Sequence, residues 1–143
     1  MCLAAMGLAE AVLCLALPAG SGRAAPPSVE LTPCPYVSIT GLKLNSVLHV
    51  PRFWYHAIRS MGQAQAAPGN ISADARTING INHTLTVWQD EAAMRACLTS
   101  GAHLAAMRAF RSMATGKTLG FTAETPPGWD KVHAQWPDRG RVV

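Results

Sequence analysis

Short runs of alternating residues mark four expected β-strands. Residues 36–42 alternate β-branched or aromatic side chains with smaller ones, which is typical of a strand. Residues 70–78 and 81–88 form two more such runs, and the Asn-Gly pair between them is a strong signal for a tight β-hairpin. Residues 118–125 alternate in the same way. We therefore expect four strands, of which the second and third are antiparallel neighbours.

A helical pattern fills the interval between the first and second strands. Pro51 is acceptable in the first turn of a helix, and the Pro-Gly pair at residues 68–69 ends the segment. Apolar residues recur in it at helical spacing, and a stripe runs along Trp54, Ala57, Ile58 and Met61 to Gln65. We expect this side of the helix to be buried, with Trp54 in the core.

A second helical region follows the hairpin. Asp90 can cap a helix that begins at Glu91, and the Ser-Gly pair at residues 100–101 divides the region in two. The second piece carries a single stripe of His103, Ala106, Met107, Phe110 and Met113. After a Pro-Pro-Gly break, residues 129–139 are expected to form a short terminal helix.

The order of these elements predicts an α+β fold. Strand, helix, two strands, helix and strand is the ferredoxin-like arrangement β-α-β-β-α-β, a four-stranded antiparallel sheet with both helices on one face. The other face then has no cover within one chain. Because a large apolar face is unstable in water, we expect a homodimer formed through it.

The first 35 residues differ from the rest of the chain, so we assign the domain to residues 36–143. Residues 1–17 are apolar except for Glu10, and Pro and Gly are frequent after them. No Lys or Arg lies in this run, and Glu10 interrupts it, which disfavours a signal peptide and a membrane span. We expect an N-terminal extension and a linker on a cytoplasmic protein. If residues 1–19 act as a signal peptide, the protein is instead secreted or periplasmic.

Composition and motifs exclude several function classes. Of the 143 residues, 49% are hydrophobic and 14% are charged, which is enough apolar material for a core. The formal net charge is +4, but no two basic residues are adjacent, so a nucleic-acid partner is not indicated. Cys97 has no partner at metal-ligand spacing and is expected to be a buried free thiol. The chain lacks G-x-G-x-x-G, P-loop and G-x-S-x-G motifs, which argues against nucleotide binding and serine hydrolysis.

Two stretches carry a resemblance to a known group of proteins. Residues 83–94, HTLTVWQDEAAM, and residues 100–107, SGAHLAAM, resemble the dimeric α/β-barrel superfamily. This superfamily includes antibiotic-biosynthesis-type monooxygenases, haem-degrading monooxygenases and spheroidene-monooxygenase-like proteins. The resemblance implies a homodimeric barrel with an apolar pocket between sheet and helices. It also implies a small hydrophobic or aromatic substrate, such as a phenol or anthrone, and an oxygenation that needs no cofactor.

Haem is the lesser alternative for a cofactor. In haem-degrading members, a tryptophan and a histidine of the second helical region contact the haem. An alignment without gaps places Cys97 at the tryptophan position and Met107 at the histidine position, so both signature residues are missing. His103 lies one turn before Met107 on the same stripe and is the remaining candidate for an iron ligand.

Several residues are candidates for an oxygenase site, and each has a structural alternative. His103 heads an otherwise apolar stripe, where a neutral imidazole can accept a proton near pH 7 or simply form a hydrogen bond at the edge of the core. Asp74 and Arg76 lie two apart on one strand, so they share a face and either orient a substrate or form a surface ion pair. For these three residues, the sequence leaves both roles open.

The other candidates are substrate-pocket residues. Tyr55 and His56 lie off the apolar stripe of the first helix and either line the rim of a cleft or face water. Trp88 ends the third strand and either closes a pocket or anchors a dimer, and Met107 lies beside His103 on its stripe. We expect a cofactor-independent, monooxygenase-like enzyme. A non-catalytic protein of the same fold that binds a ligand or assembles, and a haem-dependent oxygenase, are the alternatives.

Overall fold

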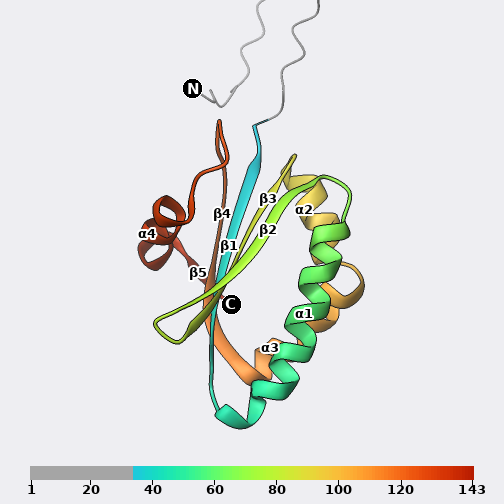
Figure 1. Cartoon of the computed structure of the whole chain (residues 1–143), viewed down its shortest axis with the longest axis vertical. Coiled ribbons are helices and arrows are strands. Elements are labelled where there is room, and N and C mark those ends of the chain that lie inside the picture. The colour runs from blue at the N-terminus through green and yellow to red at the C-terminus, as the bar shows by residue number, and fades with distance from the viewer. Residues whose placement is uncertain (1–33) are drawn as a thin grey trace, which may run out of the picture.

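An antiparallel sheet forms the centre of the computed structural model, which describes residues 34–143 (Figure 1). The strands follow the spatial order β2-β3-β1-β4-β5. Their bounds are β1 Tyr36–Leu44, β2 Asn70–Ile78, β3 Ile81–Trp88, β4 Ala114–Thr122 and β5 Arg141–Val142. The expected sheet had four strands. The fifth strand arises because Arg141 and Val142 pair with Thr118 and Lys117 of β4.

Helices connect or follow these strands. Their bounds are η1 Val47–His49, α1 Val50–Ala66, α2 Glu91–Leu98, α3 Gly101–Met113 and α4 Trp129–Arg139. No helix within residues 34–143 is long and apolar enough to cross a membrane. The predicted N-terminal extension lies almost wholly in residues 1–33, outside the described part of the chain.

Two local signals of the sequence are confirmed, one at a hairpin turn and one at a helix N-terminus. The β2–β3 hairpin turns at Asn79 and Gly80, which have φ angles of 51° and 75°, the left-handed values that a tight Asn-Gly turn requires. The Asp90 side chain caps α2 by accepting a hydrogen bond of 2.7 Å from the Ala93 backbone N–H. Both features depend on neighbouring residues, which is why the sequence predicts them.

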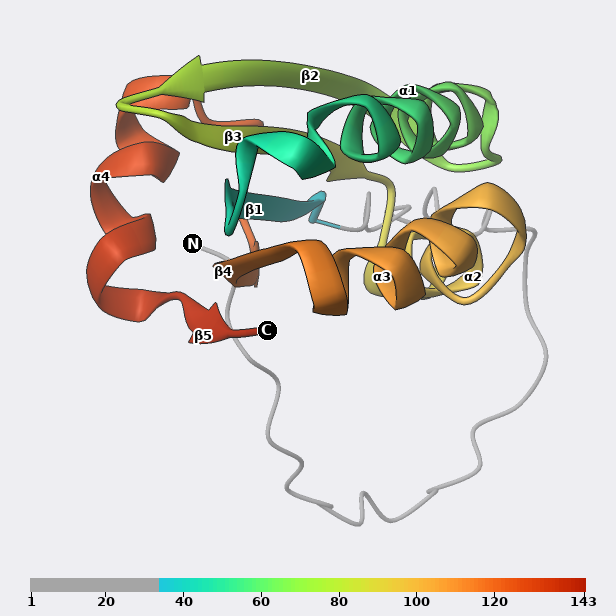
Figure 2. The ribbon, with the colours of Figure 1, turned by 90° about the horizontal axis from the view of Figure 1, so that it is seen from below.

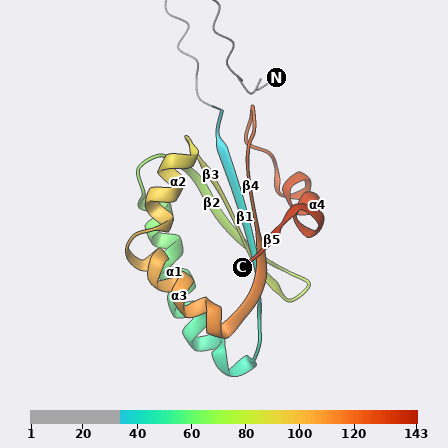
Figure 3. The ribbon, with the colours of Figure 1, turned by 180° about the vertical axis from the view of Figure 1, so that it is seen from behind.

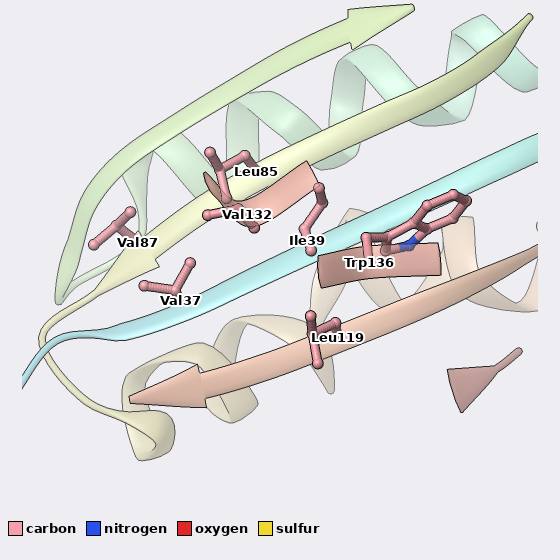
Figure 4. Close-up of a cluster of buried hydrophobic side chains, with 7 residues drawn as sticks. All are labelled: Val37, Ile39, Leu85, Val87, Leu119, Val132 and Trp136. Atoms are coloured by element: carbon pink, nitrogen blue, oxygen red, sulfur yellow. The ribbon is translucent and has the colours of Figure 1, made fainter. Parts of the chain in front are cut away.

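The two faces of the sheet are covered by different helices, which corrects the expectation of an open face. The helices α1, α2 and α3 lie on one side and α4 lies on the other, as Figures 2 and 3 show. Side chains of α4 pack on the central strands in the main apolar core (Figure 4), which consists of Val37, Ile39, Leu85, Val87, Leu119, Val132 and Trp136. A single chain therefore buries the face through which a homodimer was expected, and its sheet is open with β2 and β5 at the edges.

The buried side of α1 also differs from the predicted stripe. Phe53 is buried, whereas Trp54 and Ile58 are 45% and 66% exposed. The Phe53 ring packs on Phe110 of α3, with ring centroids 4.9 Å apart. Because α1 packs against a neighbouring helix as well as the sheet, its buried side is rotated by one residue from the predicted one. The assignment of Trp54 to the core is wrong for this reason.

Candidate functional site

The sheet face toward α1, α2 and α3 carries a row of hydroxyl side chains on its central strands. Val37 and Ile39 point toward α4, so the alternating residues of the same strand point toward the other helices. The residues there are half-buried and form the hydroxyl row: Ser38, Thr40, Thr84, Thr86 and Thr118. Thr40 Oγ1 lies 3.1 Å from Thr118 Oγ1, and Thr86 Oγ1 donates to the Ser38 carbonyl at 3.4 Å. The three helices thus cover these hydroxyl side chains only in part.

One side of α3 is also half-buried. His103, Met107 and Phe110 follow one another at spacings of four and three, so they share a side of the helix. The Nδ1 atom of His103 is buried and has no hydrogen-bond partner among the described residues. Burial lowers the pKa of His103, and the carbonyl groups of Leu98 and His103 oppose this effect in part. The lowered pKa favours the neutral imidazole, the form that can accept a proton.

Gln63 of α1 holds the first turn of α3 in place. Its Oε1 accepts a hydrogen bond of 2.9 Å from the His103 backbone N–H, and its Nε2 donates to the carbonyls of Cys97 and Ser100, both at 3.1 Å. The Ser100 side chain makes no capping bond to α3, so Gln63 supplies the cap from another helix. Gly101, with φ +50°, allows this approach, because a Cβ there would lie 2.7 Å from Gln63 Oε1.

Gln63 was not predicted from the sequence, because it lies on a different side of α1 from the predicted stripe. The pairing of a serine before a helix with a glycine at its first position was the available signal. It indicated an unusual helix start, but it did not indicate which distant residue completes the cap.

Tyr55 and His56 line a groove between α1 and the beginning of α3. The groove has a volume of about 350 Å³ and is also lined by Arg59, Gly101, Ala102 and Ala105. Arg59 Nη1 donates to the Tyr55 hydroxyl at 2.7 Å. The structure therefore brings these two candidates to the same end of α3 as His103.

Asp74 and Arg76 lie on the opposite face of the sheet from the hydroxyl row. Asp74 accepts a hydrogen bond of 2.7 Å from Trp129 Nε1 of α4, and the Arg76 guanidinium lies 4.8 Å from the centre of the Trp129 ring. The two residues also form an exposed ion pair of 3.5 Å. The hydrogen bond from Trp129 is the largest of the effects that lower the pKa of Asp74. These contacts attach α4 to β2, and they separate both residues from His103.

Trp88 and Cys97 belong to a second buried cluster. With Ala64 of α1, they pack between the end of β3 and the helices, and Trp88 is 2% exposed. Burial raises the pKa of the Cys97 thiol. The position of the haem-contacting tryptophan is thus filled by a packed thiol, and within residues 34–143 no group of three His, Cys, Asp or Glu side chains is placed to hold a metal ion.

No protein-family model and no curated protein sequence matches the chain significantly. Solved structures do match. SnoaB from Streptomyces nogalater, a cofactor-independent oxygenase, is 19% identical with a TM-score of 0.54, over 65% of this chain and 96% of SnoaB. A candidate antibiotic biosynthesis monooxygenase from Nitrosomonas europaea is 14% identical with a TM-score of 0.58, and the match covers 66% of this chain and 94% of that protein. PA3566 from Pseudomonas aeruginosa is 14% identical with a TM-score of 0.57, and the match covers 64% of this chain and 96% of PA3566.

These similarities define the fold class. The chain shares a ferredoxin-like fold with these structures, and this agrees at the level of the fold with the resemblance seen in residues 83–94 and 100–107. At identities below 20%, a shared fold does not by itself establish the reaction.

Proposed function

We propose that the chain is an oxygenase for a small, electron-rich aromatic substrate and that it works without flavin or metal. The substrate lies between the hydroxyl row of the sheet and the His103 side of α3. The observation that carries the proposal is the buried Nδ1 of His103, which lies on a half-buried side of α3 and has no hydrogen-bond partner within residues 34–143. The fold shared with SnoaB, a cofactor-independent oxygenase, supports the reaction class.

The proposed chemistry begins with proton transfer. Neutral His103 accepts a proton from an activated CH₂ group of the substrate, such as the one between two rings of an anthrone. The resulting carbanion passes its electrons to O₂. The complete reaction converts CH₂ and O₂ into C=O and H₂O, and the substrate supplies all four electrons. Hydroxyl donors such as Thr40 and Thr118 stabilise the negative charge on the substrate oxygen during proton removal.

Substitution of His103 tests this role. We expect His103→Leu to reduce kcat/KM for anthrone oxidation by at least about 100-fold, the usual contribution of a general base. Oxygen uptake and ¹⁸O₂ incorporation into the product carbonyl measure the reaction. His49→Gln is the control, because His49 belongs to the short helix before α1. A His103→Leu protein that folds and keeps its turnover would refute the assignment.

Ligand binding without turnover is the second candidate function. The groove of Tyr55, His56 and Arg59 favours it, because aromatic rings and a guanidinium side by side suit a small aromatic acid. In this case, Arg59→Gln weakens naphthoate binding in calorimetry, and His103→Leu leaves it unchanged. Turnover of any anthrone that depends on His103 would decide against a purely binding role.

We also propose a homodimer, now on a different surface. The exposed apolar side of α1, with Trp54 and Ile58, replaces the sheet face that α4 covers. Sedimentation of the native protein should show a dimer at micromolar concentration, and the double variant Trp54→Lys, Ile58→Lys should sediment as a monomer. A native monomer, or a variant that remains dimeric, contradicts the proposal.

A further inference from the structure

The helix α4 is fastened to the sheet mainly by the burial of its apolar side. Val132 is fully buried and Trp136 is 8% exposed, and both pack on the central strands (Figure 4). Hydrogen bonds between α4 and β4 lie at the margin of this contact. Trp136 Nε1 donates to the Lys117 carbonyl at 3.0 Å, and Lys117 Nζ donates to the Pro137 carbonyl at 2.6 Å. Whatever disturbs the buried side of α4 therefore loosens the whole helix.

A histidine without hydrogen bonds lies directly beneath this side. His83 of β3 is 1% exposed, and both of its ring nitrogens are buried with no hydrogen-bond partner in the described part of the chain. Its ring centroid lies 4.6 Å from that of Trp136 and 4.9 Å from that of His133, both on α4. Gly41 of β1 lies opposite and makes room, because a Cβ there would come within 2.6 Å of the His83 ring. Buried polar atoms without partners are rare in native proteins and call for an explanation.

The surroundings of His83 do not favour a positive charge. On β2, Arg76 is its register partner, and on β1 and β4 the same face carries Lys43 and Lys117. His133 contributes a second imidazole from α4. The acidic side chain on this face of β2 is Asp74, which already binds Trp129 and Arg76. Burial, and then the proximity of His133, lower the pKa of His83.

We propose that α4 is a pH-sensitive cover of the sheet, which moves away when His83 becomes protonated. An imidazolium in this position has no acceptor among residues 34–143, and separation of α4 from the sheet lets water solvate it. The direction follows from linkage. The closed state binds a proton less readily than the open state, so closure is complete above the ordinary histidine pKa of about 6.5 and weakens below it. Each pH unit below that value reduces the ratio of closed to open protein by up to about tenfold, because one proton is taken up.

Hydrogen exchange of the full chain tests the switch. Between pH 7.5 and pH 5.0, after correction for the intrinsic exchange rates, we expect the protection of the α4 amides to fall at least tenfold. Amides of β1 and β3 should change less. His83→Leu removes the proton acceptor and keeps a similar volume, so its α4 amides should stay protected at pH 5.0. His49→Gln, a substitution outside the α4 contact, should respond as the native protein does.

Two results would overturn the proposal. One is native α4 protection that stays within twofold across this pH range, and the other is a loss of protection in His83→Leu equal to that of the native protein. If His83→Leu does not fold, an NMR titration of the native His83 ring decides the matter. Protonation of His83 while the α4 amides stay protected would show that α4 does not respond to this group.

Discussion

The cap that Gln63 provides to α3 leads to a quantitative prediction for Gln63→Leu. Leucine keeps most of the side-chain volume and removes both polar groups. The substitution deletes the Oε1 bond to the His103 N–H and the Nε2 bonds to the carbonyls of Cys97 and Ser100. A hydrogen bond of this kind contributes about 1 kcal/mol net, so three give about 3 kcal/mol. Because the Ser100 contact is exposed and water can replace it, we expect a loss of about 2 kcal/mol.

Urea unfolding followed by tryptophan fluorescence measures this loss in the free energy of unfolding. For a domain of this size, 2 kcal/mol corresponds to a decrease in Tm of about 8 °C. The matched control is Gln65→Leu, two residues away on the same helix. Gln65 makes one long, exposed hydrogen bond of 3.5 Å to the Ala73 carbonyl, so this variant should lose less than about 0.5 kcal/mol.

Hydrogen exchange at a single amide makes the test specific. The His103 N–H lies in the first turn of α3, where the helix itself offers no acceptor, and Gln63 Oε1 is its partner. Its protection should disappear in Gln63→Leu and persist in Gln65→Leu. Equal stability of the two variants, or a His103 amide that keeps its protection without the Gln63 side chain, would show that Gln63 does not cap α3.

Three further predictions concern other contacts. Gly41→Ala should lower the free energy of unfolding by about 2 kcal/mol, because the new Cβ would collide with the rings of His83 and Trp136. Gly62→Ala, in open space on α1, should raise it by up to about 1 kcal/mol, and similar urea midpoints for the two variants would contradict this packing. Asp74→Ala should cost about 1 kcal/mol, since Trp129 Nε1 loses its acceptor, and Asp74→Asn should recover part of the loss in thermal melts. Because the pKa of His103 is lowered, the folded state binds a proton less readily than the unfolded state. The His103 contribution to the free energy of unfolding is therefore full above pH 6.5 and falls on acidification by up to about 1.4 kcal/mol per pH unit. His103→Leu should show a shallower pH dependence of stability, and an unchanged slope would exclude this contribution.

The sequence by itself determined the features that depend on near neighbours. The Asn79-Gly80 hairpin and the Asp90 cap each lie within a few residues of the elements they shape, and the structure confirms both. The helix over residues 129–139 begins and ends as predicted, between a Pro-Pro-Gly break and Gly140. The half-buried stripe of α3 that contains His103 could also be read from helical spacing.

Only the tertiary structure decided which surfaces meet. The apolar stripe of α1 and its neighbour Phe53 lie side by side on the helix, and contact with Phe110 selects Phe53 for burial. The position of α4 depends on Gly41, which is far from α4 in the sequence. Because Gly41 has no side chain, the Trp136 ring can pack directly against β1. That contact covers the face expected to form a dimer, and Asp74 lies on this covered face, away from His103. The physical reason is common to all these cases: packing depends on shapes brought together across the chain, which local periodicity does not encode.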